Sequence, residues 1–421
     1  MRQPKLLTTI KTYSWPLFAQ DLLAGATVAM VALPLSLAIA IASGADPAKG
    51  LITAIVAGFL ISLLGGSRVQ IGGPTGAFIV VVFGVIAEHG YDGLVLATFM
   101  AGIILLVAGY FRAGNLIAFV PEAVVNGFTI GIGVIIATSQ LKDFFGLAVD
   151  KVPADFLEKI PALWAARETM GMAPIAIAFV TLVLIVGLRR IAPRFPGLIV
   201  AVGIGSTLVA VMSLPVDTLG SRFGELPSHL PWPELPDFSL SRIAELLPSA
   251  FVIAFLAAVE SLLSAMVADK MIDGNHRPNA ELSAQGVANL ASALFTGLPA
   301  TGAIARTATN IKAGGKTPVA GIVHAAVILL VMLLAAPLAS YLALPALAAL
   351  LIVTAWNMTE PHKWMEYARG RKSDIFLLLL TLILTVVIDL TVAIGVGVSI
   401  GFALRLSRRK SVKSDWTPPD R

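Results

Sequence analysis

The chain has 421 residues, of which 57% are hydrophobic and only 13% are charged, and its mean hydropathy is +0.88. These values lie far outside the soluble range and indicate an integral membrane protein. The sequence contains no cysteine, which excludes disulfides, thiolate nucleophiles and cysteine-ligated metals. The net charge of +5 comes from basic residues in short loops beside apolar segments. Membrane topology explains this charge better than nucleic-acid binding does.

The first 20 residues form a short, moderately basic segment. They contain Arg2, Lys5 and Lys11 and lack the apolar region and cleavage site of a signal peptide. We therefore expect residues 1–20 to remain on the chain along the cytoplasmic membrane surface. Trp15 and Phe18 are expected at the level of the lipid headgroups.

Apolar segments bounded by Gly, Pro or charge then follow in two groups of seven. The first group predicts a repeat over residues 21–213 and the second a repeat over 248–407. An extracytoplasmic loop at 214–247 separates the repeats, and a short cytoplasmic tail is expected at 408–421. A spanning helix needs about 20 apolar residues, so the pattern predicts an all-α membrane protein. Its 14 transmembrane segments are expected at 21–43, 48–65, 74–88, 92–112, 121–140, 173–190, 194–213, 248–269, 283–297, 302–312, 317–338, 341–357, 373–389 and 391–407.

Loop charges indicate how the segments are oriented. Basic residues such as Arg68, Arg112 and Lys270 collect at the ends of the even-numbered segments, whereas the long loops on the other side carry mixed or acidic charge. Because basic loops remain in the cytoplasm, both termini are expected there. An odd number of segments inverts the second repeat relative to the first. We therefore expect a multi-pass cell-membrane protein, located in a bacterial inner membrane.

The third and tenth segments are too short to cross a membrane alone, and each follows a Pro/Gly break. Short extended stretches are expected before both half-helices, at 69–73 and 296–299. Interrupted segments at matching places in two repeats indicate a transporter whose site lies between the two half-helices, because non-helical backbone at this depth is tolerated only beside protein or a polar cavity. The two breaks read Ile71-Gly-Gly-Pro-Thr-Gly-Ala-Phe78 and Leu298-Pro-Ala-Thr-Gly-Ala-Ile-Ala-Arg306.

Opposite insertion of the repeats points the starts of the two half-helices at each other. A helix N-terminus presents unpaired N–H donors and partial positive charge, so two facing starts form an anion pocket. Small residues are also common where membrane helices merely pack closely, but the paired breaks favour the binding interpretation. The predicted donors are the amides of Gly76, Ala77, Phe78, Gly302, Ala303 and Ile304.

Two charged side chains at membrane depth are candidates for binding and coupling. Arg306 lies about one turn into the tenth segment and is predicted to bind the anion, because a charge there is costly and usually has a task. Glu260 is predicted to bind the coupling cation, H⁺ or Na⁺, and thereby to favour anion binding through linked equilibria. Ser264, one turn later, would offer its hydroxyl to Na⁺ or to the carboxylate. The competing interpretation is a permanent Glu260–Arg306 ion pair that joins two helices.

The remaining polar residues give weaker signals. His324 is interpreted as a hydrogen-bonded packing residue, and the histidines as a group have no metal-ligand spacing. No Walker motif occurs in the sequence, which argues against ATP-driven transport by this chain. No cofactor is expected beyond the coupling ion, and no nucleic acid is expected as a partner.

Several motifs together resemble those of the sulfate permease (SulP) family of anion transporters, and the resemblance covers nearly the whole membrane region. The first repeat contributes Gly73-Pro-Thr-Gly-Ala77 and the segment from Pro121 to Gly131. The second contributes Glu260-Ser-Leu-Leu-Ser-Ala265, the run from Gly274 to Asn289 and the run from Pro299 to Asn310.

The resemblance implies a core domain of segments 1–4 and 8–11 that carries substrate past a gate domain of segments 5–7 and 12–14. This elevator motion usually occurs in a homodimer. Family substrates include sulfate, bicarbonate, chloride and dicarboxylates. The resemblance also implies substrate-binding roles for Arg306 and for the two half-helix starts, and a coupling role for Glu260. By residue, those starts comprise Thr75, Gly76, Ala77 and Phe78, and Thr301, Gly302, Ala303, Ile304 and Ala305.

The sequence departs from the family pattern in two places. Many members carry a polar residue, often Gln, just after the proline of the first segment, whereas this chain reads Ala32-Leu-Pro-Leu-Ser36. Ser36 is the residue expected to replace that contact. Most members continue into a cytoplasmic STAS domain, which this sequence does not contain, so properties assigned to that domain are not carried over.

These features predict a secondary active symporter of a small oxyanion, with sulfate and bicarbonate as the leading substrates and the lipid bilayer as its environment. A nucleobase symporter of the same architecture is one alternative, although a neutral base has no need of Arg306. An uncoupled anion channel or exchanger is another, in which Glu260 is only structural.

Overall fold

The computed structural model describes residues 3–117, 121–149, 152–153, 155–192, 196–388 and 390–407. The expected tail at 408–421 lies outside these ranges. The helices of the first half are α1 (Lys5–Thr9), α2 (Trp15–Ala42), α3 (Pro47–Leu64), α4 (Ile79–Tyr110), α5 (Gly114–Ile117), α6 (Glu122–Ser139), α7 (Leu141–Phe145), α8 (Phe156–Ala165), α9 (Met172–Ile191), α10 (Gly197–Val211) and α11 (Leu219–Phe223).

The second half is equally helical, and short 3-10 turns and two short strands complete the chain. Its helices are α12 (Leu240–Ile272), α13 (Pro278–Leu294), α14 (Ile304–Lys312), α15 (Val319–Ala339), α16 (Leu344–Met358), α17 (Trp364–Ala368), α18 (Lys372–Val387) and α19 (Leu390–Ser407). The 3-10 turns are η1 (Ile10–Thr12), η2 (Gly76–Phe78), η3 (Ala166–Thr169) and η4 (Pro361–Lys363), and the strands are β1 (Gly72–Gly73) and β2 (Thr301–Gly302).

The predicted helical character is confirmed, and each expected apolar segment overlaps a helix. The third and fourth segments are the two parts of α4, which are separated at Gly90, where φ is 71°. Glycine adopts this left-handed conformation without the steric cost that a Cβ imposes. Seven helices of the described ranges are long and apolar enough to cross a membrane.

Three helices begin earlier than predicted. α2 begins at Trp15 rather than at 21, so residues 15–20 are part of this helix and not of a separate surface segment. α12 begins at Leu240 rather than at 248, because Ser239 caps it by accepting a hydrogen bond from the Arg242 amide and because the helix continues through Pro248. α13 begins at Pro278 rather than at 283, since proline suits the first helical position, where an N–H has no partner to lose. Pro248, predicted as the first residue of its segment, therefore lies inside α12.

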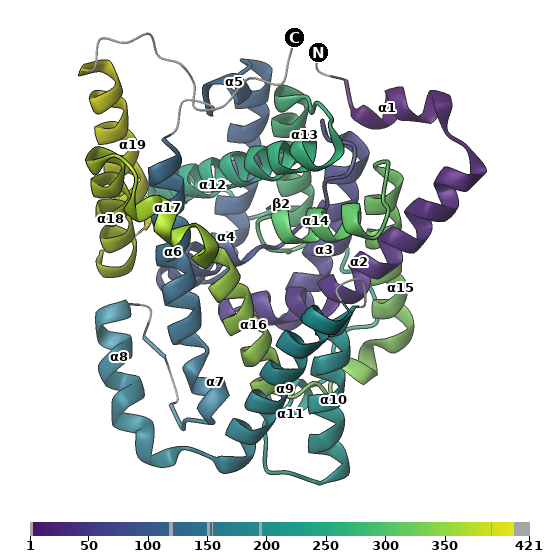
Figure 1. Ribbon diagram of the computed structural model, residues 1–421, viewed down its shortest axis with the longest axis vertical. Coiled ribbons are helices and arrows are strands. Elements are labelled where there is room, and N and C mark those ends of the chain that lie inside the picture. Colours follow the sequence, from purple (N-terminus) through teal and green to yellow (C-terminus); the bar gives the residue numbers. More distant parts are fainter. Residues whose placement is uncertain are drawn as a thin grey trace.

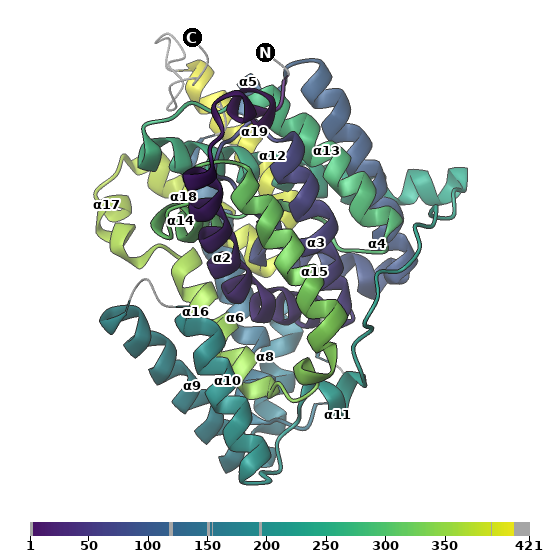
Figure 2. The ribbon, with the colours of Figure 1, turned by 90° about the vertical axis from the view of Figure 1, so that its right-hand side faces the viewer.

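The helices pack in two bundles (Figures 1 and 2). The first bundle comprises α2, α3, α4, α12, α13, α14 and α15, and the second comprises α6, α9, α10, α16, α18 and α19. Within each bundle, helices from both halves of the sequence contact each other, as α4 contacts α13 and α6 contacts α18. α2 also contacts α10 and α16 across the boundary between the bundles. The first bundle corresponds to the expected core segments and the second to the expected gate segments.

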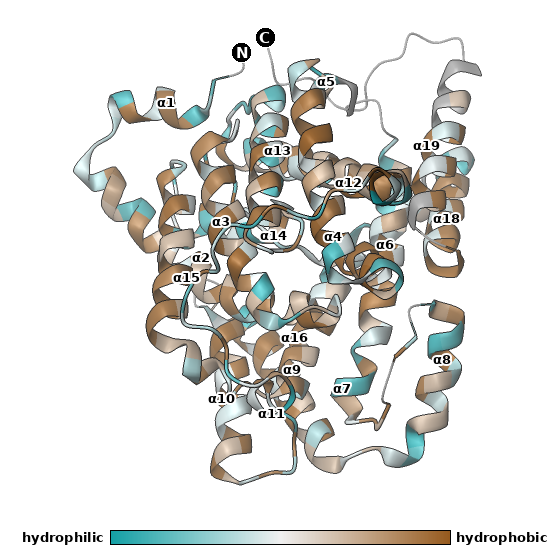
Figure 3. Cartoon of the chain, turned by 180° about the vertical axis from the view of Figure 1, so that it is seen from behind, coloured by the Kyte–Doolittle hydropathy of each residue, from teal (hydrophilic) through white to brown (hydrophobic). Residues whose placement is uncertain are grey.

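The outer surface carries large apolar side chains. On α15, Leu330, Leu334 and Leu338 are 54%, 75% and 68% exposed, and their spacing of four residues places them on one face. Figure 3 shows apolar residues along α15 and other peripheral helices. An exposed apolar stripe of this length would be unfavourable in water but fits lipid chains.

Candidate functional site

The two sequence breaks meet in space. β1 pairs antiparallel with β2, so that Gly72 lies opposite Gly302 and Gly73 lies opposite Thr301. The first half-helix begins directly after β1, at η2 and α4, and the second begins directly after β2, at α14. Pairing the strands satisfies backbone groups that would otherwise be unpaired inside the membrane. The prediction that the breaks lie close together is confirmed.

Two of the six predicted amide donors are already engaged. The Phe78 amide donates to the Thr75 carbonyl at 3.2 Å, and the Ala303 amide donates to the Ile71 carbonyl at 2.8 Å. Neither amide is therefore free to bind a ligand in this conformation. The reason at Ala303 is that strand pairing continues past Gly302, so α14 begins only at Ile304.

Three of the other predicted donors, Gly76, Ala77 and Ile304, lie at the true helix starts, whereas Gly302 lies in β2. Gly76 and Ala77 begin η2, and Ile304 and Ala305 begin α14. The first N–H groups of a helix have no partner within it. Ile304 and Ala305 are exposed, whereas Gly76 and Ala77 are buried. Gly302 has a packing role instead, because a Cβ there would lie 1.5 Å from Nε2 of Gln70.

The Arg306 guanidinium lies between the two breaks. The side chain is 1% exposed, and its Nη2 donates hydrogen bonds to Ser36 Oγ and to the Pro74 carbonyl, both at 3.1 Å. Within the described ranges, its Nε and Nη1 have no hydrogen-bond partner. The structure thus brings Ser36 and Arg306 together and leaves two buried guanidinium nitrogens without an acceptor among the described residues.

Glu260, on α12, lies beside the start of the first half-helix. Thr75 Oγ1 donates a hydrogen bond to Glu260 Oε2 at 3.0 Å. Among the described residues, no carboxylate lies within 4.0 Å of Arg306. The alternative of a permanent Glu260–Arg306 ion pair is therefore not what this conformation contains. The carboxylate contacts the first half-helix through Thr75 instead.

The hydroxyls of two predicted site residues, Ser264 and Thr301, form hydrogen bonds within the protein. Ser264 Oγ is 3.2 Å from Thr307 Oγ1, so its predicted partnership with Glu260 is not formed and Thr307 takes its place. Thr307 Oγ1 in turn accepts a hydrogen bond from the Ile71 amide. Thr301 Oγ1 donates to the Ala257 carbonyl at 2.9 Å. The sequence shows that these side chains are polar and deep, but not which neighbour each one reaches.

The second bundle covers the start of the first half-helix. A Cβ at Gly76 would lie 3.0 Å from Met358 Sδ on α16 and 3.4 Å from Ile136 Cδ1 on α6. The candidate site therefore lies where the two bundles meet. Sequence reasoning missed Met358 and Ile136, because an apolar residue on a membrane helix carries no signal that separates a site wall from ordinary packing.

A buried polar network that sequence reasoning also missed lies behind the site. Glu281 is fully buried, and its carboxylate accepts hydrogen bonds from the Gly66 amide, from Ser261 Oγ and from Gln285 Nε2 at 2.8 to 2.9 Å. Gln70, just before β1, donates to Ser261 Oγ at 2.9 Å. Three donors satisfy the carboxylate, so this network fixes the break in place. The run from Gly274 to Asn289 contains Glu281 and Gln285, and its polar residues were the sequence signal for this network.

Other polar groups lie apart from the half-helix starts. His324 is fully buried, and within the described ranges neither ring nitrogen has a hydrogen-bond partner, contrary to the interpretation of a hydrogen-bonded residue.

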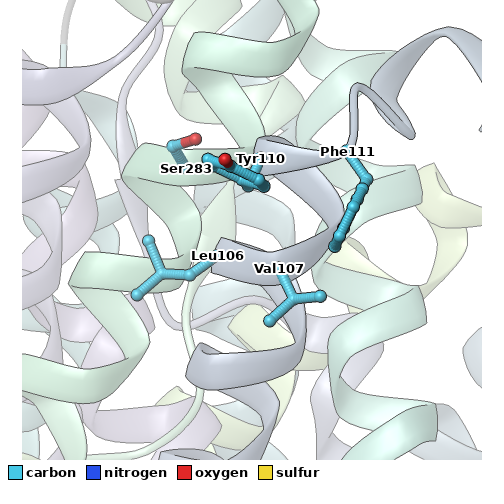
Figure 4. A pocket seen from close by; sticks show the side chains of 5 residues that line it. All are labelled: Leu106, Val107, Tyr110, Phe111 and Ser283. Carbon is cyan, nitrogen blue, oxygen red and sulfur yellow. The ribbon is translucent and has the colours of Figure 1, made fainter.

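A hollow away from the candidate site is lined by apolar side chains at the end of α4 and by Ser283 of α13 (Figure 4). Its Tyr110 and Phe111 form an edge-to-face pair, which is typical of a membrane interface.

Comparisons with known proteins agree with this arrangement. The sequence profile of the sulfate permease family matches residues 18–381. A Bacillus subtilis protein with the name "Putative sulfate transporter YvdB" is 45% identical over 88% of this chain and 70% of its own length. The bicarbonate transporter BicA of a Picosynechococcus strain is 32% identical over 78% of this chain and 60% of its own length.

Solved structures show the same fold. The transmembrane domain of a cyanobacterial BicA superposes with a TM-score of 0.81 at 30% identity and covers 90% of this chain and 98% of that one. The murine solute carrier 26 family member A9, an anion transporter, gives a TM-score of 0.86 at 19% identity, with 97% and 72% covered. The second match concerns the fold alone.

Proposed function

Because the chain belongs to the sulfate permease family, whose members are transporters and not enzymes, we propose that it is a secondary active transporter of a small oxyanion. Sulfate and bicarbonate are the favoured substrates, since relatives bear those names. We further propose that H⁺ or Na⁺ drives uptake. The chain covers 60% of the length of the Picosynechococcus relative, so its activity is inferred from its own site.

The observation that carries this proposal is the Arg306 guanidinium. It is buried and, among the described residues, it has no carboxylate partner and two nitrogens without a hydrogen-bond acceptor. A charge at membrane depth costs at least about 2.5 kcal/mol. An anion bound between Arg306 and the two helix starts would supply both the missing charge and the missing acceptors.

Glu260 supports coupling through the same site. Its carboxylate contacts Thr75 at the start of the first half-helix, so its negative charge opposes an anion bound there. Binding of H⁺ or Na⁺ to Glu260 removes that repulsion, and the anion then favours cation binding to the same extent. Within the described ranges, no cluster of three His, Asp or Glu side chains stands ready for a metal ion. A Na⁺ site would therefore combine Glu260 with hydroxyl and carbonyl oxygens.

The two bundles support an elevator mechanism. The proposed substrate groups Arg306 and Glu260 and both helix starts belong to the first bundle, whereas Met358 and Ile136 of the second bundle lie against Gly76 at the start of the first half-helix. Movement of the first bundle along the second would carry the anion from one side to the other. We propose 14 membrane crossings in two inverted repeats, with both termini in the cytoplasm and a homodimer as the assembly.

The test is uptake of labelled sulfate and bicarbonate into proteoliposomes, with and without pH and Na⁺ gradients. Arg306→Ala should abolish saturable uptake, while Arg190→Ala, at an exposed position of α9, should leave it unchanged. Glu260→Gln should retain anion binding but remove the dependence on the gradient. Undiminished uptake by Arg306→Ala contradicts the anion site. Competition by uracil instead of anions supports the nucleobase alternative, and gradient-independent wild-type uptake supports the uncoupled one.

A further inference from the structure

Lys159 is a buried cation outside the candidate site. It lies on α8, at the end of the molecule opposite α1 and α5 (Figure 1). The side chain is 3% exposed, and its Nζ donates a hydrogen bond to Ser139 Oγ at 2.9 Å and lies 5.8 Å from the centre of the Phe83 ring. Among the described residues, no carboxylate lies within 4.0 Å of it.

This environment is unfavourable for an ammonium group. Burial lowers the pKa of Lys159, and the Asp155 carboxylate at the start of α8 opposes this effect only in part. An ammonium carries three N–H donors, and Ser139 supplies the only hydrogen-bond acceptor that it has within the described ranges. An apolar side chain of similar length would fill the same space without the cost of burying a charge. Lys159 is therefore a poor choice for the stability of the fold. We infer that its positive charge serves a function instead.

The ammonium contacts two residues that lie one to two helical turns from the start of the first half-helix. On α6, Ser139 follows Ile136 by three residues, about one helical turn, and Ile136 lies against Gly76 at the start of the first half-helix. On α4, Phe83 lies two turns beyond Gly76. Ser139 belongs to the second bundle and Phe83 to the first. Lys159 thus bridges the two bundles one to two turns beyond the anion site.

We propose that Lys159 forms an outer binding subsite for the same small oxyanion, a proposal that rests on the transport function above. In the conformation described here, Ser139 and Phe83 hold the ammonium and close this end of the route. When the first bundle moves away, the Phe83 contact breaks and an anion oxygen replaces Ser139 Oγ as the acceptor. The subsite attracts the anion to the entrance, since a positive charge in a low-dielectric passage raises the local concentration of anions.

The test compares the KM for anion uptake, with the anion supplied at the α8 side, across four chains. Lys159→Gln should raise KM about five-fold, the effect of losing one charged contact, and should weaken its dependence on ionic strength. Lys159→Arg keeps the charge and should remain close to wild type. Arg167→Gln removes an exposed charge on the same loop and should leave KM unchanged. Equal KM values for Lys159→Gln and wild type, or an equal rise in Arg167→Gln, overturn the proposal.

A second variant shifts KM in the opposite direction and keeps the test decisive if Lys159→Gln fails to fold. Ser139→Ala removes the internal acceptor but retains the ammonium, so it should lower KM about two-fold or more. A rise in KM for a folded Ser139→Ala overturns the subsite. A wild-type chain without saturable anion uptake overturns the transport function itself. Normal wild-type uptake that Arg306→Ala abolishes, together with unchanged Lys159 and Ser139 variants, overturns the outer subsite alone.

Discussion

At the scale of single residues, the site depends on how closely the backbone approaches one guanidinium. Gly73 has φ of 150°, and a Cβ on it would lie 2.3 Å from Arg306 Nη1. That distance is shorter than any real carbon–nitrogen contact, so only glycine leaves room for the guanidinium here. The Arg306 nitrogens keep their positions because Gly73, which is far from Arg306 in the sequence, has no side chain.

Gly73→Ala should therefore displace the guanidinium and impair anion binding without unfolding the helices. We expect the KM for anion uptake to rise about ten-fold or more, the effect of about 1.4 kcal/mol of lost binding. Thermal stabilisation of the purified variant by sulfate should fall in parallel. Gly84→Ala is the matched control, because a Cβ at Gly84 meets nothing within 4 Å. Equal anion affinity in both variants would show that Arg306 does not bind the substrate.

The sequence predicted which residues gather at the site better than it predicted their contacts. Arg306 and Glu260 were identified because a charged side chain inside an apolar run is costly and needs a reason, and Ser36 was identified through the family resemblance. The engaged amides of Phe78 and Ala303 were not foreseen, because hydrogen bonding there depends on where the β1–β2 pairing stops. The extent of this pairing depends on contacts between residues far apart in the chain, and a single sequence does not reveal such contacts.

At the scale of elements, the non-helical stretches are held by amide side chains. Asn289 on α13 donates to the Ala300 carbonyl and accepts from the Ala300 amide, both at 2.9 Å. Asn310 on α14 donates to the Val69 carbonyl at 2.8 Å. Each side chain replaces the neighbour that a longer strand would have supplied. The half-helix starts are thus positioned by the helices that flank them.

Asn289→Ala should destabilise the break before α14 more than it affects the rest of the fold. It leaves the buried N–H and C=O of Ala300 unpaired, which we expect to cost about 2 to 4 kcal/mol of unfolding free energy. The melting temperature should fall, and anion binding should weaken because α14 carries Arg306. Asn115→Ala, at an exposed position on α5, should change neither quantity. An unchanged melting temperature in Asn289→Ala would contradict the role of Asn289 in holding Ala300.

Element boundaries were predicted less well than element types. The apolar segments gave the helices, since a bilayer demands long apolar stretches. The starts of α2, α12 and α13 were placed too late, at 21, 248 and 283, because each segment was taken to begin with its apolar run. In a large bundle, polar helix turns are stabilised by neighbours such as the Ser261–Glu281 contact, which composition does not reveal.

At the scale of the whole molecule, the first bundle contains the proposed anion site, and the second bundle covers the start of its first half-helix. Arg306, Glu260 and both breaks lie in the first bundle, and the contacts at Gly76 come from the second. Lys159 of α8 contacts Ser139 of the second bundle and Phe83 of the first. The proposed movement of one bundle along the other would break that contact, because Phe83 lies on the same half-helix as the proposed anion donors.

Cross-linking the two bundles should therefore arrest transport. The chain has no native cysteine, so Phe83→Cys with Ser139→Cys, joined by a short bismaleimide, connects the first bundle to the second. We expect anion uptake to fall to background while the melting temperature is maintained. His89→Cys with Glu245→Cys, whose native side chains are 3.1 Å apart on α4 and α12, places the same cross-link within the first bundle and should leave uptake intact. Full uptake by the Phe83–Ser139 cross-linked chain would exclude movement of one bundle past the other.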